Sequence, residues 1–116
     1  MALFELIING KGTGIPVERA ESFTSRLAGL MGKARIDKGL MITDCGSIHT
    51  FFMKSDIDAV FIGSSGAVVK IIAGLKPWRL VFPVSRAKET LELAPGQASG
   101  LGLKYADIIT LSPAGR

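Results

Sequence analysis

The sequence predicts a single α+β domain with a mostly antiparallel, strongly curled or barrel-like sheet and one or two short helices. Its 116 residues suit one domain, and a 47% apolar against 21% charged composition is enough to form a core. Glycine is frequent, with 14 residues, and short apolar runs alternate with glycine or proline turns. We therefore expect many short strands in one domain spanning residues 1–116.

The expected strands follow these apolar runs. A Ser64-Ser65-Gly66 turn joins two of them into the clearest hairpin. Residues 10–16, with three glycines and a closing Pro16, are predicted to form a loop, and residues 78–82, between two prolines, an irregular or edge segment. The runs predicted as strands are residues 3–8, 40–43, 48–53, 59–62, 67–73, 90–93 and 108–111.

Two segments are predicted to be helical. In residues 21–32, Phe23, Leu27 and Leu30 recur at spacings of four and three, and Gly32 ends the pattern. A second, shorter helix is expected over residues 97–101, after the Pro95-Gly96 turn. No repeat divides the chain.

The net charge of +4 is concentrated in the second half of the chain. Residues 70–88 contain five basic side chains and no acidic one. Such a segment is either a solvated face or a surface for an anionic ligand or protein partner. Only Trp78 and Phe82 are interleaved with these cations, so a nucleic-acid partner is not expected.

The chain contains no run of about 18 apolar residues, so no transmembrane segment is predicted. Its N-terminus lacks the basic lead of a signal peptide. We expect a cytoplasmic protein; a signal peptide already removed would make it an exported one.

Cys45, His49 and Met53 form the chain's most chemically suggestive run, at spacings of four. A thiolate, an imidazole and a thioether are ligands for soft metals, and a Cys–His pair can act as nucleophile and base. In a strand, however, four residues span about 13 Å, too far for three ligands to share an ion, and Asp44 beside Cys45 opposes thiolate formation. No metal or cofactor is therefore expected, and Cys45 and His49 are weak candidates for catalysis or metal binding. The alternative is that His49 holds a turn by a hydrogen bond while Phe51 and Met53 pack in the core.

Glu92 stands between Leu91 and Leu93 in an expected strand, so its side chain faces opposite to theirs. It either faces solvent or pairs with Arg26 or Arg79, and such a pair would give a polar spot for a ligand.

Six short motifs follow one another along the chain: Arg26-Leu27-Ala28-Gly29-Leu30-Met31, Gly39-Leu40-Met41-Ile42, Ile48-His49-Thr50-Phe51-Phe52-Met53, Asp58-Ala59-Val60-Phe61-Ile62, Gly66-Ala67-Val68-Val69 and Leu91-Glu92-Leu93-Ala94-Pro95-Gly96. In this order they resemble the small prokaryotic family catalogued as domain of unknown function number 192. The similarity covers roughly residues 20–110, and we expect a bacterial source. It implies a sheet-rich single domain, found in cytoplasmic and exported forms, with no settled biochemical function. Ala106 stands where the family has glycine before Asp107, which puts a tight turn there in question.

Three function classes follow. The leading one is a noncatalytic binding or interaction module with a basic surface, with candidate binding residues Arg26, His49, Met53, Arg79 and Glu92. The second is a metal- or thiol-dependent enzyme, or a metal carrier, centred on Cys45 and His49. The third is a structural accessory domain without a small-molecule site.

Overall fold

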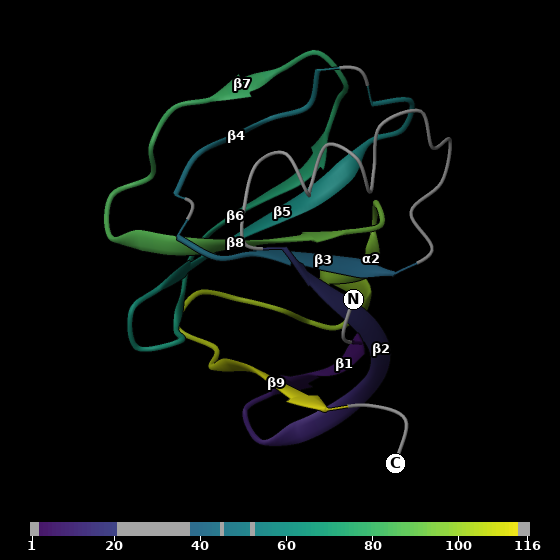
Figure 1. Cartoon of the computed structure of the whole chain (residues 1–116), viewed down its shortest axis with the longest axis vertical. Helices are drawn as coiled ribbons and strands as arrows, with labels where there is room; N and C mark the ends of the chain where they lie inside the picture. Colours follow the sequence, from purple (N-terminus) through teal and green to yellow (C-terminus); the bar gives the residue numbers. More distant parts are fainter. Residues whose placement is uncertain (1–2, 21–37, 45, 52, 114–116) are drawn as a thin grey trace.

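A computed structural model describes residues 3–20, 38–44, 46–51 and 53–113 of the chain. In these residues the fold has nine strands and one short helix (Figure 1). The helix expected over residues 21–32 lies outside the described residues. The strands and the helix are β1 (Leu3–Ile8), β2 (Lys11–Ala20), β3 (Gly39–Ile42), β4 (Ile48–His49), β5 (Ile57–Gly63), β6 (Val68–Leu75), β7 (Leu80–Val81), β8 (Ala87–Leu93), α2 (Gln97–Gly100) and β9 (Ile109–Pro113).

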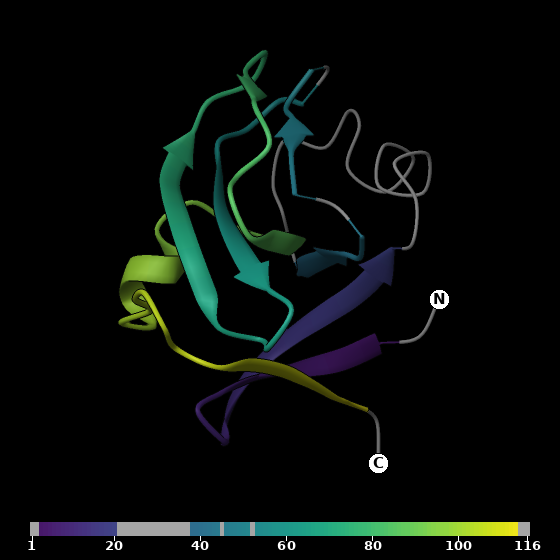
Figure 2. The ribbon, with the colours of Figure 1, turned by 90° about the vertical axis from the view of Figure 1, so that its left-hand side faces the viewer.

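Seven strands form one mixed sheet in the order β6-β5-β8-β3-β2-β1-β9, and β4 pairs with β7 in a separate two-stranded sheet. All the pairings are antiparallel except that of β2 with β3. The β-rich, mostly antiparallel architecture is thus confirmed. The prediction of a strongly curled or barrel-like sheet was wrong, because the sheet stays open (Figure 2). Next to its edge strands β6 and β9, Ala67 and Ile108 form an isolated antiparallel bridge that does not close the sheet.

Strand β2 occupies most of the segment predicted as a loop. Glycines are usually disfavoured in strands, but here side chains support the backbone where the β1–β2 register shifts after Glu5. The Glu5 carboxylate accepts a hydrogen bond from the Gly14 N–H (2.9 Å), and the Thr13 hydroxyl donates to the Leu6 carbonyl (2.7 Å). Gly14 also has a φ of 76°, a conformation that glycine adopts without strain. A bulged hairpin arm therefore replaces the expected loop.

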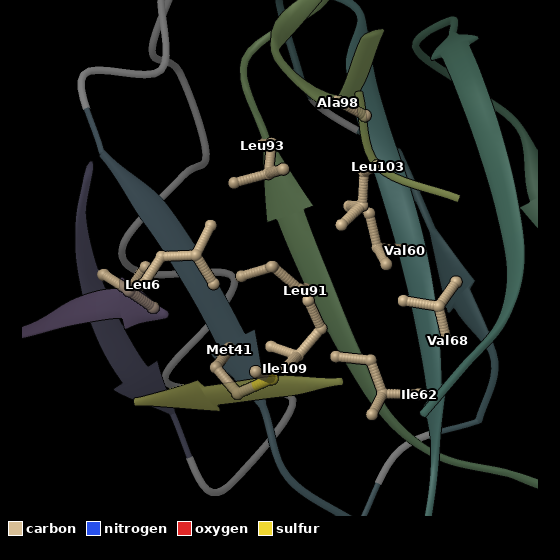
Figure 3. Packing of buried hydrophobic residues seen from close by; sticks show 11 residues of the cluster. Leu6, Met41, Val60, Ile62, Val68, Leu91, Leu93, Ala98, Leu103 and Ile109 are labelled. Atoms are coloured by element: carbon tan, nitrogen blue, oxygen red, sulfur yellow. The ribbon is translucent and has the colours of Figure 1, made fainter. Parts of the chain in front are cut away.

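The large sheet is apolar on both faces, so residues alternate between two core clusters. Leu91 and Leu93 of β8 point into the first cluster, with Val60 and Ile62 of β5 (Figure 3). The intervening residues of β5 point into the second cluster, which is covered by Ile48 of β4 and by the partly buried Val81 of β7. The two-stranded sheet is thereby attached to the second face of the large sheet.

Buried carboxylates secure the turns around this core. Both oxygens of Asp58, which is fully buried, accept backbone N–H hydrogen bonds, from Gly74 (2.9 Å) and from Ala98 of α2 (3.0 Å). Asp58 therefore has the structural, capping use that polar residues often have at turns.

No helix in the described residues is long and apolar enough to cross a membrane.

Asp107 fixes the turn before β9. Its carboxylate accepts hydrogen bonds from the Asn9 side-chain amide (3.0 Å) and the Lys104 backbone N–H (2.9 Å). These donors, the Asn9 amide first, lower the pKa of Asp107 below its ordinary value of 3.8, although burial opposes the shift. Ala106 adopts a φ of 74°, so the turn forms without the glycine of the family pattern.

Candidate functional site

Thr50 connects the strand β4 segment to residues 76–79, which lie more than twenty positions further along the chain. Its hydroxyl donates to the Lys76 carbonyl (2.6 Å) and accepts from the Arg79 N–H (2.8 Å). Its backbone N–H donates to the Arg79 carbonyl (2.8 Å), and its carbonyl accepts from the Trp78 N–H (2.9 Å). Thr50 is completely buried. One threonine therefore determines where Trp78 and Arg79 stand on the surface.

Three rings stack beside this connection. The ring centroids of His49 and Phe51 are 4.6 Å apart and those of Phe51 and Trp78 5.8 Å apart, each pair with an interplanar angle of 26°. The Nδ1 atom of His49 accepts a hydrogen bond from the Phe51 N–H (3.2 Å). Because Nδ1 accepts, the neutral ring carries its proton on Nε2. His49 thus has the hydrogen-bonded role considered as an alternative, with its Nδ1 atom held by the Phe51 N–H.

Residues 78–82 present large apolar side chains to solvent. Trp78 is 57% exposed, Leu80 57% and Phe82 76%, whereas the intervening Val81 packs against the second core cluster. Side chains alternate along a strand, so Leu80 and Phe82 point away from the core together. We call Trp78, Leu80 and Phe82 the apolar strip. Leu80 lies in β7 of the two-stranded sheet, and Trp78 and Phe82 lie just before and just after that strand.

Two cations of the basic segment border the apolar strip. Arg79 is exposed, and its guanidinium donates to the Pro77 carbonyl (3.5 Å). Lys76 pairs with Asp56 (Nζ to Oδ2 3.8 Å) with both side chains solvent-accessible, an arrangement that contributes little free energy. Both charges therefore remain accessible to an anionic partner.

The candidate binding residues do not share one described surface. His49 and Arg79 lie at the two-stranded sheet, but Met53 is buried in the second core cluster. Glu92 is fully buried in β8, opposite Leu40 of β3 and Ala59 of β5. Of the two alternatives for Glu92, a solvent-facing side chain is therefore wrong.

Some of the predictions fall on residues that the structure does not describe. Arg26 and Cys45 are among them, so the proposed Glu92–Arg26 pair and the Cys45–His49 contact stay predictions. Among the residues that are described, no three His, Cys, Asp or Glu side chains gather as a metal site would require.

Sequence reasoning missed Thr50 and underrated the aromatic residues of this face. A threonine between two rings, as in His49-Thr50-Phe51, is only a weak signal of a positioning role. Its hydrogen-bond partners Lys76 and Arg79 lie too far along the sequence to be predicted from spacing. The alternation of Trp78, Leu80 and Phe82 was the available signal for an outward apolar face.

Comparison with known proteins places the chain in a family. The model of the family DUF192, described as Uncharacterized ACR, matches residues 5–111. A UPF0127 protein of Thermococcus kodakarensis is 33% identical over 117 residues, covering 93% of this chain and 74% of that protein. A UPF0127 protein of Pyrococcus horikoshii is 35% identical over 98 residues, covering 80% of this chain and 84% of that protein. These relatives are archaeal, so the bacterial source stays a prediction.

Two crystal structures have a similar fold. One is of a protein of unknown function from Novosphingobium aromaticivorans, with a TM-score of 0.79 and 20% identity over 93% of this chain and 84% of that one. The other is of a putative transcription regulator from Sinorhizobium meliloti, with a TM-score of 0.79 and 22% identity over 95% of this chain and 94% of that one. With the family model spanning nearly the whole sequence, the conclusion is that this chain belongs to the uncharacterised DUF192 family, whose relatives here are named UPF0127 proteins.

Proposed function

We propose that the protein is a noncatalytic interaction module that docks through the apolar strip onto an anionic membrane surface. The observation that carries this proposal is the outward exposure of Trp78, Leu80 and Phe82 on one short segment. Exposed apolar clusters of this kind mark protein or membrane interaction sites. Burial of the same side chains in a bilayer interface would release the water that now covers them.

The size of the strip favours a membrane over a folded protein partner. An aromatic side chain buries about 150–250 Å² when fully covered, so Trp78 and Phe82 together present roughly 200–300 Å² at the exposures given above. A stable protein–protein interface buries about 800 Å² on each partner. A bilayer needs no such area, because a few inserted side chains and cations suffice for reversible binding.

The composition of the strip and its border also suits a lipid surface. Tryptophan combines a large apolar ring with an N–H group and is enriched at membrane–water interfaces. Arg79 and Lys76 beside it carry positive charge, and each cation near an anionic leaflet contributes about 1 kcal/mol of attraction. The Thr50 hydrogen bonds hold this segment in place before binding, which reduces the entropy lost on docking.

Vesicle co-sedimentation tests the proposal. The protein is mixed with vesicles of phosphatidylcholine alone and of phosphatidylcholine with phosphatidylglycerol, and we expect stronger binding to the anionic ones. Leu80→Ser with Phe82→Ser should weaken binding about tenfold or more, since each loses roughly 1 kcal/mol or more of apolar transfer. Leu3→Ser is the matched control, because Leu3 is 43% exposed on β1, outside the strip.

Two results would contradict membrane docking. One is equal binding by the double variant and the wild type. The other is the absence of vesicle binding together with a self-association, seen by analytical ultracentrifugation, that the double variant abolishes; this would assign the strip to a second copy of the chain.

The alternative function centred on Cys45 and His49 has its own test. A metal carrier or metalloenzyme requires stoichiometric metal in the purified protein. A thiol enzyme requires Cys45 to alkylate faster at neutral pH than a free model cysteine. Absence of metal together with ordinary thiol reactivity would remove this alternative and leave the interaction module unaffected.

A further inference from the structure

The end of the β5–β6 hairpin borders a hollow of about 440 Å³. This volume lies within the range of small-molecule sites, about 300–1,000 Å³. We call it the basic hollow, because two cations and no acid are among its lining residues. Its polar lining side chains are Ser64, Ser65, Arg86, Lys88 and Tyr105, and its apolar wall is formed by Ala67 and Val69.

The fold turns both cations toward this site. The β5–β8 register passes from Ile62 opposite Glu89 to Gly63 opposite Ala87, which leaves Lys88 as the extra residue of a β-bulge. A bulge redirects the side chain it carries. Arg86 precedes it with a φ of 69°, an uncommon conformation for a residue other than glycine. Ala87 between them packs against the second core cluster, so both cations stand away from the core.

The opposite wall is fixed to β6 by backbone hydrogen bonds. The Ala106 N–H donates to the Val68 carbonyl, and the Val68 N–H donates to the Asp107 carbonyl, both at 2.9 Å. Tyr105, which is 67% exposed as a residue, therefore stands at a defined position. The wall and the hairpin are joined before any ligand arrives, so little ordering is needed on binding.

The polar groups of the basic hollow have unused hydrogen-bonding capacity. Across residues 3–20, 38–44, 46–51 and 53–113, no side-chain hydrogen bond or ion pair involves Arg86, Lys88 or Tyr105. Two cations in one concave site without a counter-charge raise the local potential for anions. A bound anion would neutralise both.

A second hollow offers a contrast. It has a volume of about 290 Å³ and includes Lys11 and Lys104 in its lining. There the Lys104 amine already pairs with the Asp107 carboxylate (3.3 Å), which also lines that hollow. An incoming anion would meet a negative charge in the second hollow and none in the basic hollow.

We propose that the basic hollow binds the phosphate monoester group of a small organic molecule, whose remaining part lies against Tyr105 and the apolar wall. A phosphate monoester carries a charge of about −1.5 to −2 and three acceptor oxygens, which suits an arginine fork, a lysine amine and serine hydroxyls together. A carboxylate has one charge and two oxygens and would use fewer of these donors. The exposed Tyr105 ring offers a stacking surface for a planar group.

Isothermal titration calorimetry with adenosine 5′-monophosphate, inorganic phosphate and adenosine tests this site on the full chain. We expect the monophosphate to bind more tightly than phosphate and adenosine not to bind. Lys88→Gln with Arg86→Gln should weaken the monophosphate at least tenfold, and Tyr105→Ala should weaken the monophosphate more than phosphate. Lys70→Gln, an exposed β6 residue outside the lining, should change affinity less than twofold.

Amide chemical shifts of the unmodified protein make the outcome independent of how the variants fold. Titration with the monophosphate should first change the amide chemical shifts of residues 63–69, 86–88 and 105–106. The proposal would be overturned if no shifts occurred there at about 5 mM ligand. A Kd above that concentration corresponds to a binding free energy of less than about 4 kcal/mol in magnitude. Equal affinity of the double variant and the wild type would overturn it as well, as would shifts centred on the apolar strip.

Discussion

Thr50 and Arg79, 29 positions apart in sequence, are joined by a backbone hydrogen bond from Thr50 to Arg79 and a second from the Arg79 N–H to the Thr50 hydroxyl, each 2.8 Å long. The same hydroxyl donates to Lys76. The residue that positions the exposed face is therefore itself inaccessible, and the face can be altered without touching the residue that supports it.

Replacement of Thr50 by valine keeps the shape and removes the hydroxyl. The Arg79 N–H and the Lys76 carbonyl then lose their partner, which should lower the free energy of unfolding by about 2 kcal/mol. Urea denaturation measures the loss, and hydrogen exchange should show a faster Arg79 amide. Thr110→Val, at an exposed β9 position, should stay within about 0.5 kcal/mol of wild type. Equal losses in the two variants would contradict the role of Thr50.

Asp58→Asn should lower the stability of the folded protein, although it changes only one atom of a buried side chain. Both Asp58 oxygens accept backbone N–H bonds, whereas an asparagine presents one oxygen and one N–H donor. We expect a loss of about 2–3 kcal/mol in the free energy of unfolding. Asp56→Asn, which alters a solvent-accessible pair with Lys76, should cost less than about 1 kcal/mol. The interpretation fails if chemical denaturation ranks the two variants the other way.

Asp107 should make stability depend on pH in the acid range. Its pKa is lowered in the folded protein, mainly by the Asn9 amide and the Lys104 N–H. The folded state therefore binds fewer protons than the unfolded state, and this stabilisation is present above the unfolded value of 3.8 and lost as pH falls through the lower folded pKa.

Thermal unfolding of Asp107→Asn measures that effect. The Tm difference from wild type should be largest near neutral pH and shrink as pH falls below 3.8, the ordinary value. Glu89→Gln, whose carboxylate accepts no hydrogen bond within the described residues, serves as the control. A Tm difference for Asp107→Asn that is constant over the whole acid range would show that its pKa shift does not contribute.

Ala106→Gly should stabilise the protein. Ala106 has a φ of 74°, and a left-handed conformation costs a residue with a Cβ roughly 1–2 kcal/mol, partly offset by the greater chain entropy of glycine. We expect a gain of about 1 kcal/mol by urea denaturation. Ala73→Gly, at an exposed β6 position without a positive φ, should instead lose about 0.5–1 kcal/mol. Destabilisation by both changes would contradict this account.

The locally encoded parts of the fold were predictable. The Ser64-Ser65-Gly66 turn joins β5 to β6 as expected, with Gly66 at a φ of 90°, and α2 follows the Pro95-Gly96 turn. Each depends on neighbouring residues alone. Strand β2 was not predictable in this way, because its glycine-rich backbone depends on contacts across the hairpin, from Gly14 to the Glu5 carboxylate and from the Thr13 hydroxyl to Leu6.

The candidate site was predictable in part. His49 stood out as the one histidine, and Arg79 as part of the basic segment. The segment itself divides in the fold, since Lys76 and Arg79 border the apolar strip whereas Arg86 and Lys88 line the basic hollow. Charge counted along a chain cannot show that division. The division arises because the chain turns between β7, at the apolar strip, and β8, at the basic hollow.

The pairing of β1 with β9, which sets Phe4 opposite Pro113, has a consequence for synthesis on the ribosome. Strand β1 receives one of its two neighbours, β9, only after about a hundred further residues have been translated. At about 5–20 residues per second this interval is on the order of ten seconds. Throughout this interval one backbone edge of β1 remains open to pairing with other chains, and the emergence of β9 from the ribosome is what closes that edge.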